Sequence, residues 1–268
     1  MLRERIISAA VLLPLVAACA WLGSPWFTAL VLLALVLGAR EFAALGALAG
    51  HQVAPWLSMA TAAAFALERG VLGGRLQAAV LAASLLGVTI WYVLHYHSPT
   101  RTESWAITLA AGVYVGFLGS HLIALRLLEN GLGWLAVAVV TMWVSDTGAY
   151  ALGRLLGRHK MAPVLSPKKT WEGAAGGLVT AVLCAVAIAV LAGIGAVHGL
   201  AAGLLVGLIC PFGDLAISMV KRQVGVKDTG KLIPGHGGVL DRLDTLLFVA
   251  PLVYYYAALV AGAAAVGG

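Results

Sequence analysis

The chain has 268 residues, of which 62% are hydrophobic and only 10% are charged, and its mean hydropathy is +0.98. These values exclude an ordinary soluble domain, in which about a quarter of the residues are charged, and they predict a polytopic membrane protein. The formal net charge of +6 does not indicate a nucleic-acid-binding protein, because the basic residues lie between apolar segments and not on one face of a soluble body.

Nine apolar segments approach the length of about 20 residues that a helix needs to cross a bilayer. The first follows Arg3 and Arg5 and contains a box, Val16–Cys19, that is similar to a lipoprotein cleavage site. We expect this segment to stay uncleaved, because everything after it is also membrane-embedded. The third is short and ends before Glu68, so it could be re-entrant or tilted. The nine segments are 6–22, 26–46, 53–67, 75–94, 105–127, 132–151, 173–194, 198–217 and 245–264.

The Lys and Arg residues are distributed unevenly between the two sides that nine spans would create. If the N-terminus is cytoplasmic, fourteen of the seventeen fall on the cytoplasmic side, and the other three are Arg69, Arg75 and Arg126. Cytoplasmic loops of membrane proteins carry such an excess of positive charge. We therefore predict an all-α integral membrane protein with about nine transmembrane helices and an external C-terminus.

The candidate chemistry lies in the C-terminal half of the chain. Residues 1–130 carry few polar groups and no recognisable chemistry, whereas two long polar loops lie at 152–172 and 218–244. No internal repeat or soluble linker divides the sequence. We predict one membrane-embedded domain, 1–268, whose catalytic half is 131–268 and whose active site lies at the cytoplasmic ends of the C-terminal helices.

The first polar loop offers an anion site. Asp146 lies near the inner end of the sixth apolar segment, where it should face a polar cavity or, alternatively, be hydrated at the interface. The segment Ser166-Pro167-Lys168-Lys169-Thr170 places two ammonium groups and two hydroxyls just before a helix N-terminus, close to Glu172. Free N–H groups and the helix dipole favour anions there. For a bare lysine pair, simple anchoring at the membrane surface is the alternative.

The second polar loop and its flanks, 214–244, hold interleaved carboxylates and cations that suit a metal-bound phosphate. In Pro234–Gly238, three glycines would let the backbone approach an anion, and His236 could contact a phosphate or serve as a general base. If Asp241 and Asp244 lie on the first turn of the last helix, their spacing puts both carboxylates on one face, where Asp214 could meet them around a cation. The charged residues are Asp214, Lys221, Arg222, Lys227, Asp228, Lys231, Asp241, Arg242 and Asp244.

Four motifs follow one another within 27 residues: Ser218–Arg222, Lys227-Asp228, Pro234–Gly238 and Asp241–Asp244. Together they resemble the signature of phosphatidate cytidylyltransferases, also called CDP-diacylglycerol synthases. The segments Ser145–Tyr150 and Ser166–Gly173 resemble that family too, so the likeness covers about 141–247, whereas the first 130 residues are similar only in hydropathy.

The resemblance implies that the cytidylyl group of CTP is transferred to phosphatidic acid, giving CDP-diacylglycerol and pyrophosphate for phospholipid biosynthesis. It also implies a homodimer and a Mg²⁺ requirement with Asp214 and Asp241 as ligands, to which we add Asp244 as a residue that supports them or holds a second cation. We expect the protein in a bacterial inner membrane, and the distribution of Lys and Arg predicts that its site faces the cytoplasm. The expected catalytic residues are Asp214, Lys221, Arg222, Lys227, Asp228, His236, Asp241, Arg242 and Asp244. The expected substrate-binding residues are Asp146, Ser166, Lys168, Lys169, Thr170, Glu172, Ser218, Gly237 and Gly238.

Two other classes of membrane protein are less consistent with the sequence. CDP-alcohol phosphatidyltransferases carry an Asp-Gly pair followed by Ala-Arg and two further Asp residues, but here Asp146 is followed by Thr147, and Asp241 and Asp244 have a different spacing. Transporters place charges near mid-membrane and often contain inverted repeats. Here the charges gather at helix ends, and the two halves of the chain are unlike.

Overall fold

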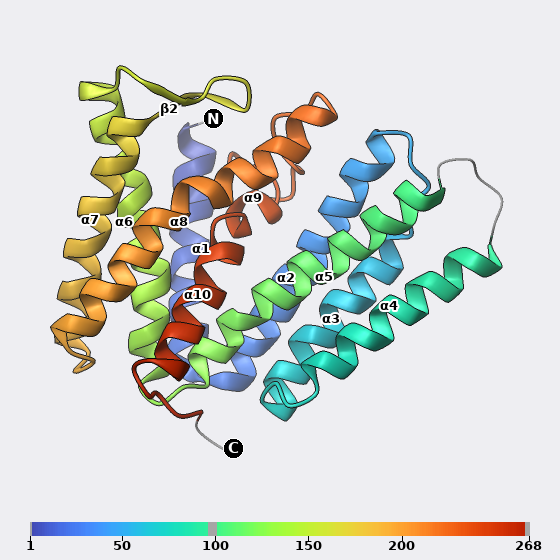
Figure 1. The fold of residues 1–268 in the computed structure, drawn as a ribbon, viewed down its shortest axis with the longest axis horizontal. Coiled ribbons are helices and arrows are strands. Elements are labelled where there is room, and N and C mark those ends of the chain that lie inside the picture. Colours follow the sequence, from blue (N-terminus) through green and yellow to red (C-terminus); the bar gives the residue numbers. More distant parts are fainter. Residues whose placement is uncertain (1, 96–100, 266–268) are drawn as a thin grey trace. The chain divides into compact units, whose positions relative to one another are not determined.

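The computed structural model describes residues 2–95 and 101–265, with side chains from residue 6 onward. Within these residues each of the nine predicted apolar segments contains a helix (Figure 1). The elements are α1 (Leu2–Leu22), α2 (Ser24–Leu48), α3 (Pro55–Leu72), α4 (Gln77–Leu94), α5 (Arg101–Arg126), α6 (Gly131–Leu156), β1 (Lys160–Ala162), β2 (Ser166–Thr170), α7 (Trp171–Leu191), α8 (Ala196–Gln223), α9 (Leu240–Leu243) and α10 (Leu246–Leu259).

Six of the described helices, α2 and α4 to α8, are long and apolar enough to cross a membrane. The helix α1 contributes a shorter apolar stretch, Ile6–Leu22. The helix α3 carries Glu68 and Arg69, and α10 has only 14 residues. The chain is therefore a polytopic membrane protein with six clear candidate spans, and the nine-span arrangement stays a prediction.

The first polar loop contains a small sheet that the all-α prediction missed. The helix α6 continues to Leu156, and β1 then pairs with β2 in an antiparallel hairpin, with Lys160 opposite Thr170 and Ala162 opposite Ser166. The segment is rich in Lys and Pro and has no apolar alternation, so the usual strand pattern is absent from its sequence.

The last helix also begins later than the prediction requires. Asp241 lies on the separate short helix α9, Asp244 lies in the turn that follows, and α10 begins at Leu246. The two carboxylates therefore do not share the first turn of the last helix, which was the condition for placing them on one helical face. The physical reason is that Asp241 accepts hydrogen bonds from the preceding loop and Asp244 accepts the N–H of Thr245, so each carboxylate stabilises a turn.

The chain divides into two compact units, which we describe separately. The first consists of Met1–Ala124 and Val220–Leu243. In it, α2 packs against α1, α3 and α9, and α3 packs against α4. Leu35, Phe65 and Val115 are fully buried in this unit. The segment 220–243, which carries most of the second polar loop, thus folds onto the N-terminal helices.

The second unit consists of Leu125–Met219 and Asp244–Gly268. Here α6 packs along α7 and α10, and β2 lies against both α6 and α7 (Figure 1). Small residues allow the close approach of α6 and α7: a Cβ on Gly177 would lie 3.0 Å from the carbonyl oxygen of Ser145, and one on Gly173 would lie 2.7 Å from that of Ala149.

Candidate active site

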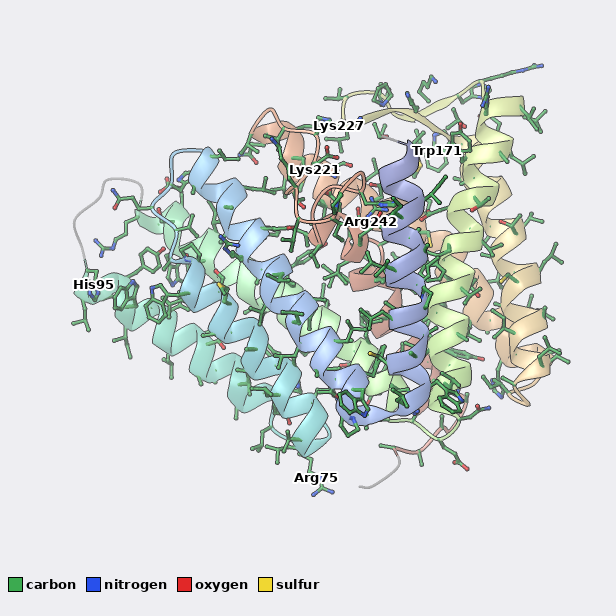
Figure 2. All side chains as sticks on the ribbon, turned by 180° about the vertical axis from the view of Figure 1, so that it is seen from behind. Arg75, His95, Trp171, Lys221, Lys227 and Arg242 are labelled. Carbon is green, nitrogen blue, oxygen red and sulfur yellow. The ribbon has the colours of Figure 1, made fainter. Side chains whose placement is uncertain are left out.

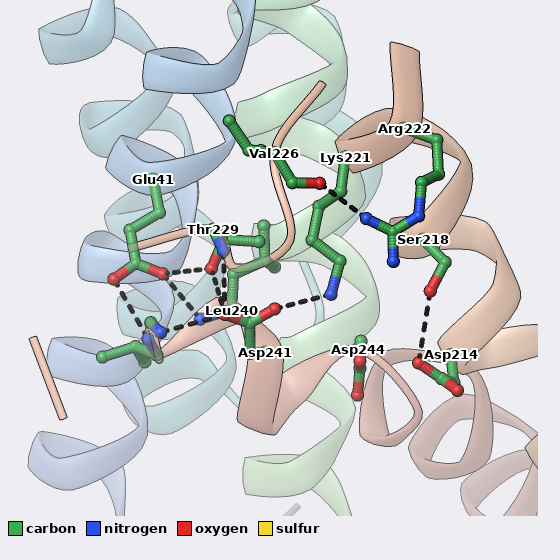
Figure 3. Close-up of polar contacts among 12 residues, drawn as sticks. Glu41, Asp214, Ser218, Lys221, Arg222, Val226, Thr229, Leu240, Asp241 and Asp244 are labelled. Carbon is green, nitrogen blue, oxygen red and sulfur yellow. Dashed lines mark hydrogen bonds and ion pairs between the residues drawn. The ribbon is translucent and has the colours of Figure 1, made fainter. Parts of the chain in front are cut away.

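Lys221 and Asp241 form a buried ion pair in the first unit. The Nζ atom of Lys221 lies 2.7 Å from Oδ1 of Asp241, and the two side chains are only 9% and 5% exposed. The other carboxylate oxygen, Oδ2, accepts the N–H of Thr229 at 2.8 Å, the N–H of Gly238 at 2.9 Å and the hydroxyl of Thr229 at 3.0 Å (Figure 3). We call these residues, Lys221, Thr229, Gly238 and Asp241, the Asp241 cluster.

The surroundings of Asp241 decide its charge. Burial by itself would raise the pKa of this carboxyl, but the Lys221 ammonium and the N–H groups of Gly238 and Thr229 outweigh burial and hold the pKa below its ordinary value of 3.8. Asp241 is therefore an anion at neutral pH.

The glycine turn closes on this carboxylate. Gly237 has φ +83°, a conformation that favours glycine, and a Cβ there would lie 2.7 Å from Oδ2 of Asp241. The N–H of Ile233 donates to the carbonyl of Gly237 at 2.9 Å, and the N–H of His236 donates to the carbonyl of Ile233 at 2.9 Å. The glycines were predicted to bring the backbone to an anion, and the anion that they approach here is Asp241 itself.

Glu41, which lies on α2 of the same unit, is a residue that no sequence motif indicated. Its Oε1 accepts the N–H of Val239 at 3.0 Å, and its Oε2 accepts the N–H of Leu240 at 2.9 Å and the hydroxyl of Thr229 at 2.9 Å (Figure 3). One signal for it was present, because a carboxylate inside an apolar helix is costly and usually has a function. The partners of Glu41 were not readable, since they lie 188 to 199 positions away in the chain.

His236 connects the second polar loop to α1. Its Nδ1 lies 2.7 Å from the hydroxyl of Ser8, and that hydroxyl also donates to the carbonyl of Pro234 at 3.1 Å. The imidazole was predicted to contact phosphate, and in this structure one of its nitrogens is used to hold the loop.

Exposed charges surround the Asp241 cluster in sequence. The exposed residues are Arg222, Lys227, Asp228 and Arg242. Nη1 of Arg222 donates to the carbonyl of Val226 at 2.8 Å. Figure 2 shows Lys221, Lys227 and Arg242 toward one end of the first unit and Arg75 at its opposite end. The cationic end of this unit is suited to an anionic ligand.

The second unit contains another lysine–carboxylate pair. The Nζ atom of Lys169, on β2, lies 2.8 Å from Oδ2 of Asp214, on α8, and donates to the carbonyl of Pro211 at 2.9 Å. The hydroxyl of Ser218 approaches Oδ1 of Asp214 at 3.5 Å. The side chain of Asp214 is 38% exposed, so this carboxylate is much more open to solvent than Asp241. We call Lys169, Asp214 and Ser218 the Asp214 cluster.

Other predicted residues of the first polar loop hold its hairpin in place. Thr170 is buried and caps α7, its hydroxyl accepting the N–H of Gly173 at 3.1 Å. Glu172 accepts the N–H groups of Arg158 and His159 and lies 2.6 Å from Nδ1 of His159. Lys168 is exposed on β2 beside the partly buried Ser166.

Asp146 and Asp244 lie outside the two clusters as we define them. Asp146 is an exposed residue of α6, which continues to Leu156, so it does not mark the end of that helix. Asp244 is half-buried, and its Oδ1 accepts the N–H of Thr245 at 2.7 Å.

The fit of the predicted metal ligands can be judged from the chemistry of each carboxylate. Among the described residues, no group of three or more His, Cys, Asp and Glu side chains is arranged to hold a metal ion. Asp214 and Asp241 each face a lysine ammonium, which occupies a place that a cation could take. Carboxylate oxygens are the hard ligands that Mg²⁺ prefers, so both residues fit such a cation in charge and donor type.

The family model and the individual proteins that match this chain agree with one another. The model of a family described as "Cytidylyltransferase family" matches residues 3–260. The phosphatidate cytidylyltransferase of Bacillus subtilis is 40% identical over 182 residues, 67% of this chain and 67% of that protein. That of Staphylococcus saprophyticus is 39% identical over 150 residues, 55% of this chain and 57% of its own length. That of Brucella suis is 36% identical over 267 residues, which cover 97% of this chain and 94% of that protein.

Proposed function

The chain belongs to the cytidylyltransferase family, and we infer from this that it transfers the cytidylyl group of CTP to phosphatidate, giving CDP-diacylglycerol and pyrophosphate. It is a nucleotidyltransferase of phospholipid synthesis. The observation that carries this conclusion is the family match over 3–260, nearly the whole chain. The likeness to the Brucella suis protein extends over both units as well as the two polar loops.

The reaction needs no nucleophilic side chain. An oxygen of the phosphatidate phosphate forms a bond to the α-phosphorus of CTP, while the bond from that phosphorus to the oxygen bridging to the β-phosphate breaks, and pyrophosphate leaves. The attacking oxygen is already anionic. The tasks of the protein are alignment of the two substrates and neutralisation of phosphate charge.

We assign phosphate binding to cations of the two units. In the first unit these are Lys221, Arg222, Lys227 and Arg242, with Asp228 orienting a neighbouring cation and His236 holding the loop. This assignment is supported by the exposure of Arg222, Lys227 and Arg242. In the second unit, the residues that would bind substrate are Asp146, Ser166, Lys168, Lys169 and Ser218. Thr170 and Glu172 support the hairpin of this unit through their hydrogen bonds. Gly237 and Gly238 would support Asp241 in the first.

We further propose that Asp214 and Asp241 hold Mg²⁺ and that Asp244 supports them. When bound, a divalent cation would neutralise charge that develops on the phosphates during transfer. Two observations support the proposal. Asp241 is anionic at neutral pH, and Asp214 and Asp241 each already bind a positively charged group, a lysine ammonium. The nine-span topology, the cytoplasmic orientation of the site and the homodimer are further proposals; the charge asymmetry supports the first two.

A direct assay tests the proposed activity. Detergent-purified protein is mixed with phosphatidate, Mg²⁺ and CTP labelled in the cytosine, and we expect labelled lipid and pyrophosphate to appear in equal amounts. Omission of phosphatidate should abolish both products. Absence of labelled lipid from folded protein, while the Bacillus subtilis relative is active in the same micelles, would contradict the proposal.

A further inference from the structure

We propose that Glu41 is a positioning residue for the cytidylyl transfer: from α2 it holds the segment 229–240 and thereby fixes Asp241. This inference rests on the proposed function. It assigns a role in the reaction to the N-terminal half of the chain, in which the sequence shows no recognisable chemistry. Glu41 acts through the loop and not by contact with either substrate.

The contacts of Glu41 span the loop from one end to the other. One carboxylate oxygen accepts the N–H of Val239 at 3.0 Å, and the other accepts the N–H of Leu240 at 2.9 Å, at the start of α9. The second oxygen also accepts the hydroxyl of Thr229 at 2.9 Å. The four-residue helix α9 cannot satisfy its first N–H groups internally, so an acceptor from α2 replaces the missing partners.

The same hydroxyl connects Glu41 to the proposed metal ligand. The Oγ1 atom of Thr229 lies 2.9 Å from Oε2 of Glu41 and 3.0 Å from Oδ2 of Asp241 (Figure 3). The main-chain N–H of Thr229 also donates to Asp241, at 2.8 Å. A displacement of the Glu41 carboxylate would therefore change the donors that orient Asp241.

Two glycines of the segment 229–240 lie against the carboxylate of Glu41. A Cβ on Gly230 would lie 2.6 Å from one oxygen of Glu41, and a Cβ on Gly238 would lie 2.3 Å from the other. Real Cβ atoms do not approach oxygen so closely. A side chain at either position would therefore push the Glu41 carboxylate away from the place where it accepts the N–H groups of Val239 and Leu240.

The test is the isosteric variant Glu41→Gln, in which an amide NH₂ replaces one acceptor and faces donors. The matched control is Glu68→Gln: Glu68 is buried in the same unit, accepts the N–H of Leu76 at 2.7 Å and pairs with the amide of Gln77, far from the loop in sequence. For Glu41→Gln we expect kcat to fall about 10- to 100-fold, as is typical when a group that orients a ligand is lost. The KM for CTP should change less than about threefold, because no substrate contact is removed.

A second measurement does not depend on activity. Amide hydrogen exchange of the free protein in micelles should be faster in 229–240 for Glu41→Gln and unchanged there for Glu68→Gln, because local opening controls exchange. Wild-type activity and unchanged exchange in folded Glu41→Gln would overturn the inference. An inactive wild-type protein would instead overturn the proposed function, and the exchange data would still show whether Glu41 holds the loop.

Discussion

Two carboxylates with the same proposed task have very different surroundings. Asp241 is buried and surrounded by four hydrogen-bond contacts, one of them from the Lys221 ammonium. Asp214 is partly exposed, and its firm partner among the described contacts is Lys169. Asp241 therefore stabilises the fold in addition to its proposed role in the site, whereas the exposed pair of Asp214 should contribute little to the stability of the fold.

The variants Asp241→Asn and Asp214→Asn should separate these two roles. Asp241→Asn leaves the buried Lys221 ammonium without its counter-charge, and breaking such a pair costs about 3–5 kcal/mol. Asp214→Asn should destabilise much less, because exposed pairs contribute about 0–1 kcal/mol, although both variants should lower turnover by orders of magnitude. Thermal unfolding in detergent and turnover by folded protein measure the two effects. Equal melting temperatures for the two variants would contradict this distinction.

The difference in stability between the wild type and Asp241→Asn should also depend on pH. Because folding holds the pKa of Asp241 below its ordinary value of 3.8, its ionised form stabilises the native state above that value, and the contribution is lost as pH falls further through the folded-state pKa. The gap in melting temperature between wild type and Asp241→Asn should therefore be constant from pH 7 to about pH 5 and shrink below about pH 4.

At the scale of helices, glycines set how closely α7 and α8 approach. A Cβ on Gly207 would lie 2.8 Å from the Cα of Leu178 and 2.7 Å from its Cδ1, and a Cβ on Gly203 would lie 2.7 Å from the Cα of Val182. Backbone atoms cannot move aside as flexible side chains can. The contact between these apolar helices thus depends on small residues, as is common where helices pack within lipid.

Gly207→Ala should force α7 and α8 apart and destabilise the second unit by about 1–3 kcal/mol, the usual cost of overpacking. Gly87→Ala on α4 is the matched control, because a Cβ there meets nothing within 4 Å. The control should be neutral or stabilising by up to about 1 kcal/mol, since alanine favours helix. Melting temperatures measured in one detergent test this, and similar values for the two variants would contradict the packing argument.

At the scale of the whole molecule, the nine-span arrangement predicts on which side of the membrane each end of the first unit lies. Arg75 and Lys227 are both exposed and lie at opposite ends of the first unit (Figure 2). The positive charge of the loop that carries Lys227 places it on the cytoplasmic side in the nine-span arrangement, with Arg75 outside.

We expect Arg75→Cys to react with a membrane-impermeant maleimide in intact cells and Lys227→Cys to react only after the membrane is opened. Both variants are made in a background in which Cys19, Cys184 and Cys210 are replaced, because these thiols are free. Labelling of both positions from the same side would contradict the nine-span topology.

Properties that depend on neighbouring residues were determined by the sequence alone. The helices within the nine apolar segments follow from runs of apolar side chains, and the family follows from motifs within 141–247, so the helical nature of these segments and the family were predicted correctly. The hairpin at 160–170 and the separate helix α9 were missed, because apolar periodicity does not shape these segments. Backbone pairing of β1 with β2 shapes the hairpin, and hydrogen bonds to the Asp241 carboxylate shape the turn before α9.

Only the tertiary structure decided which charges meet. Asp241 pairs with Lys221, and Lys169 with Asp214, although the sequence shows only that all four are polar residues near helix ends. Glu41 is the clearest case: its position inside an apolar helix signalled a cost, but the donors that offset the cost come from a loop about 190 residues away. A run of apolar residues is visible in the sequence and predicts a helix without knowledge of the fold. A hydrogen bond between distant residues depends on two groups that only folding brings together.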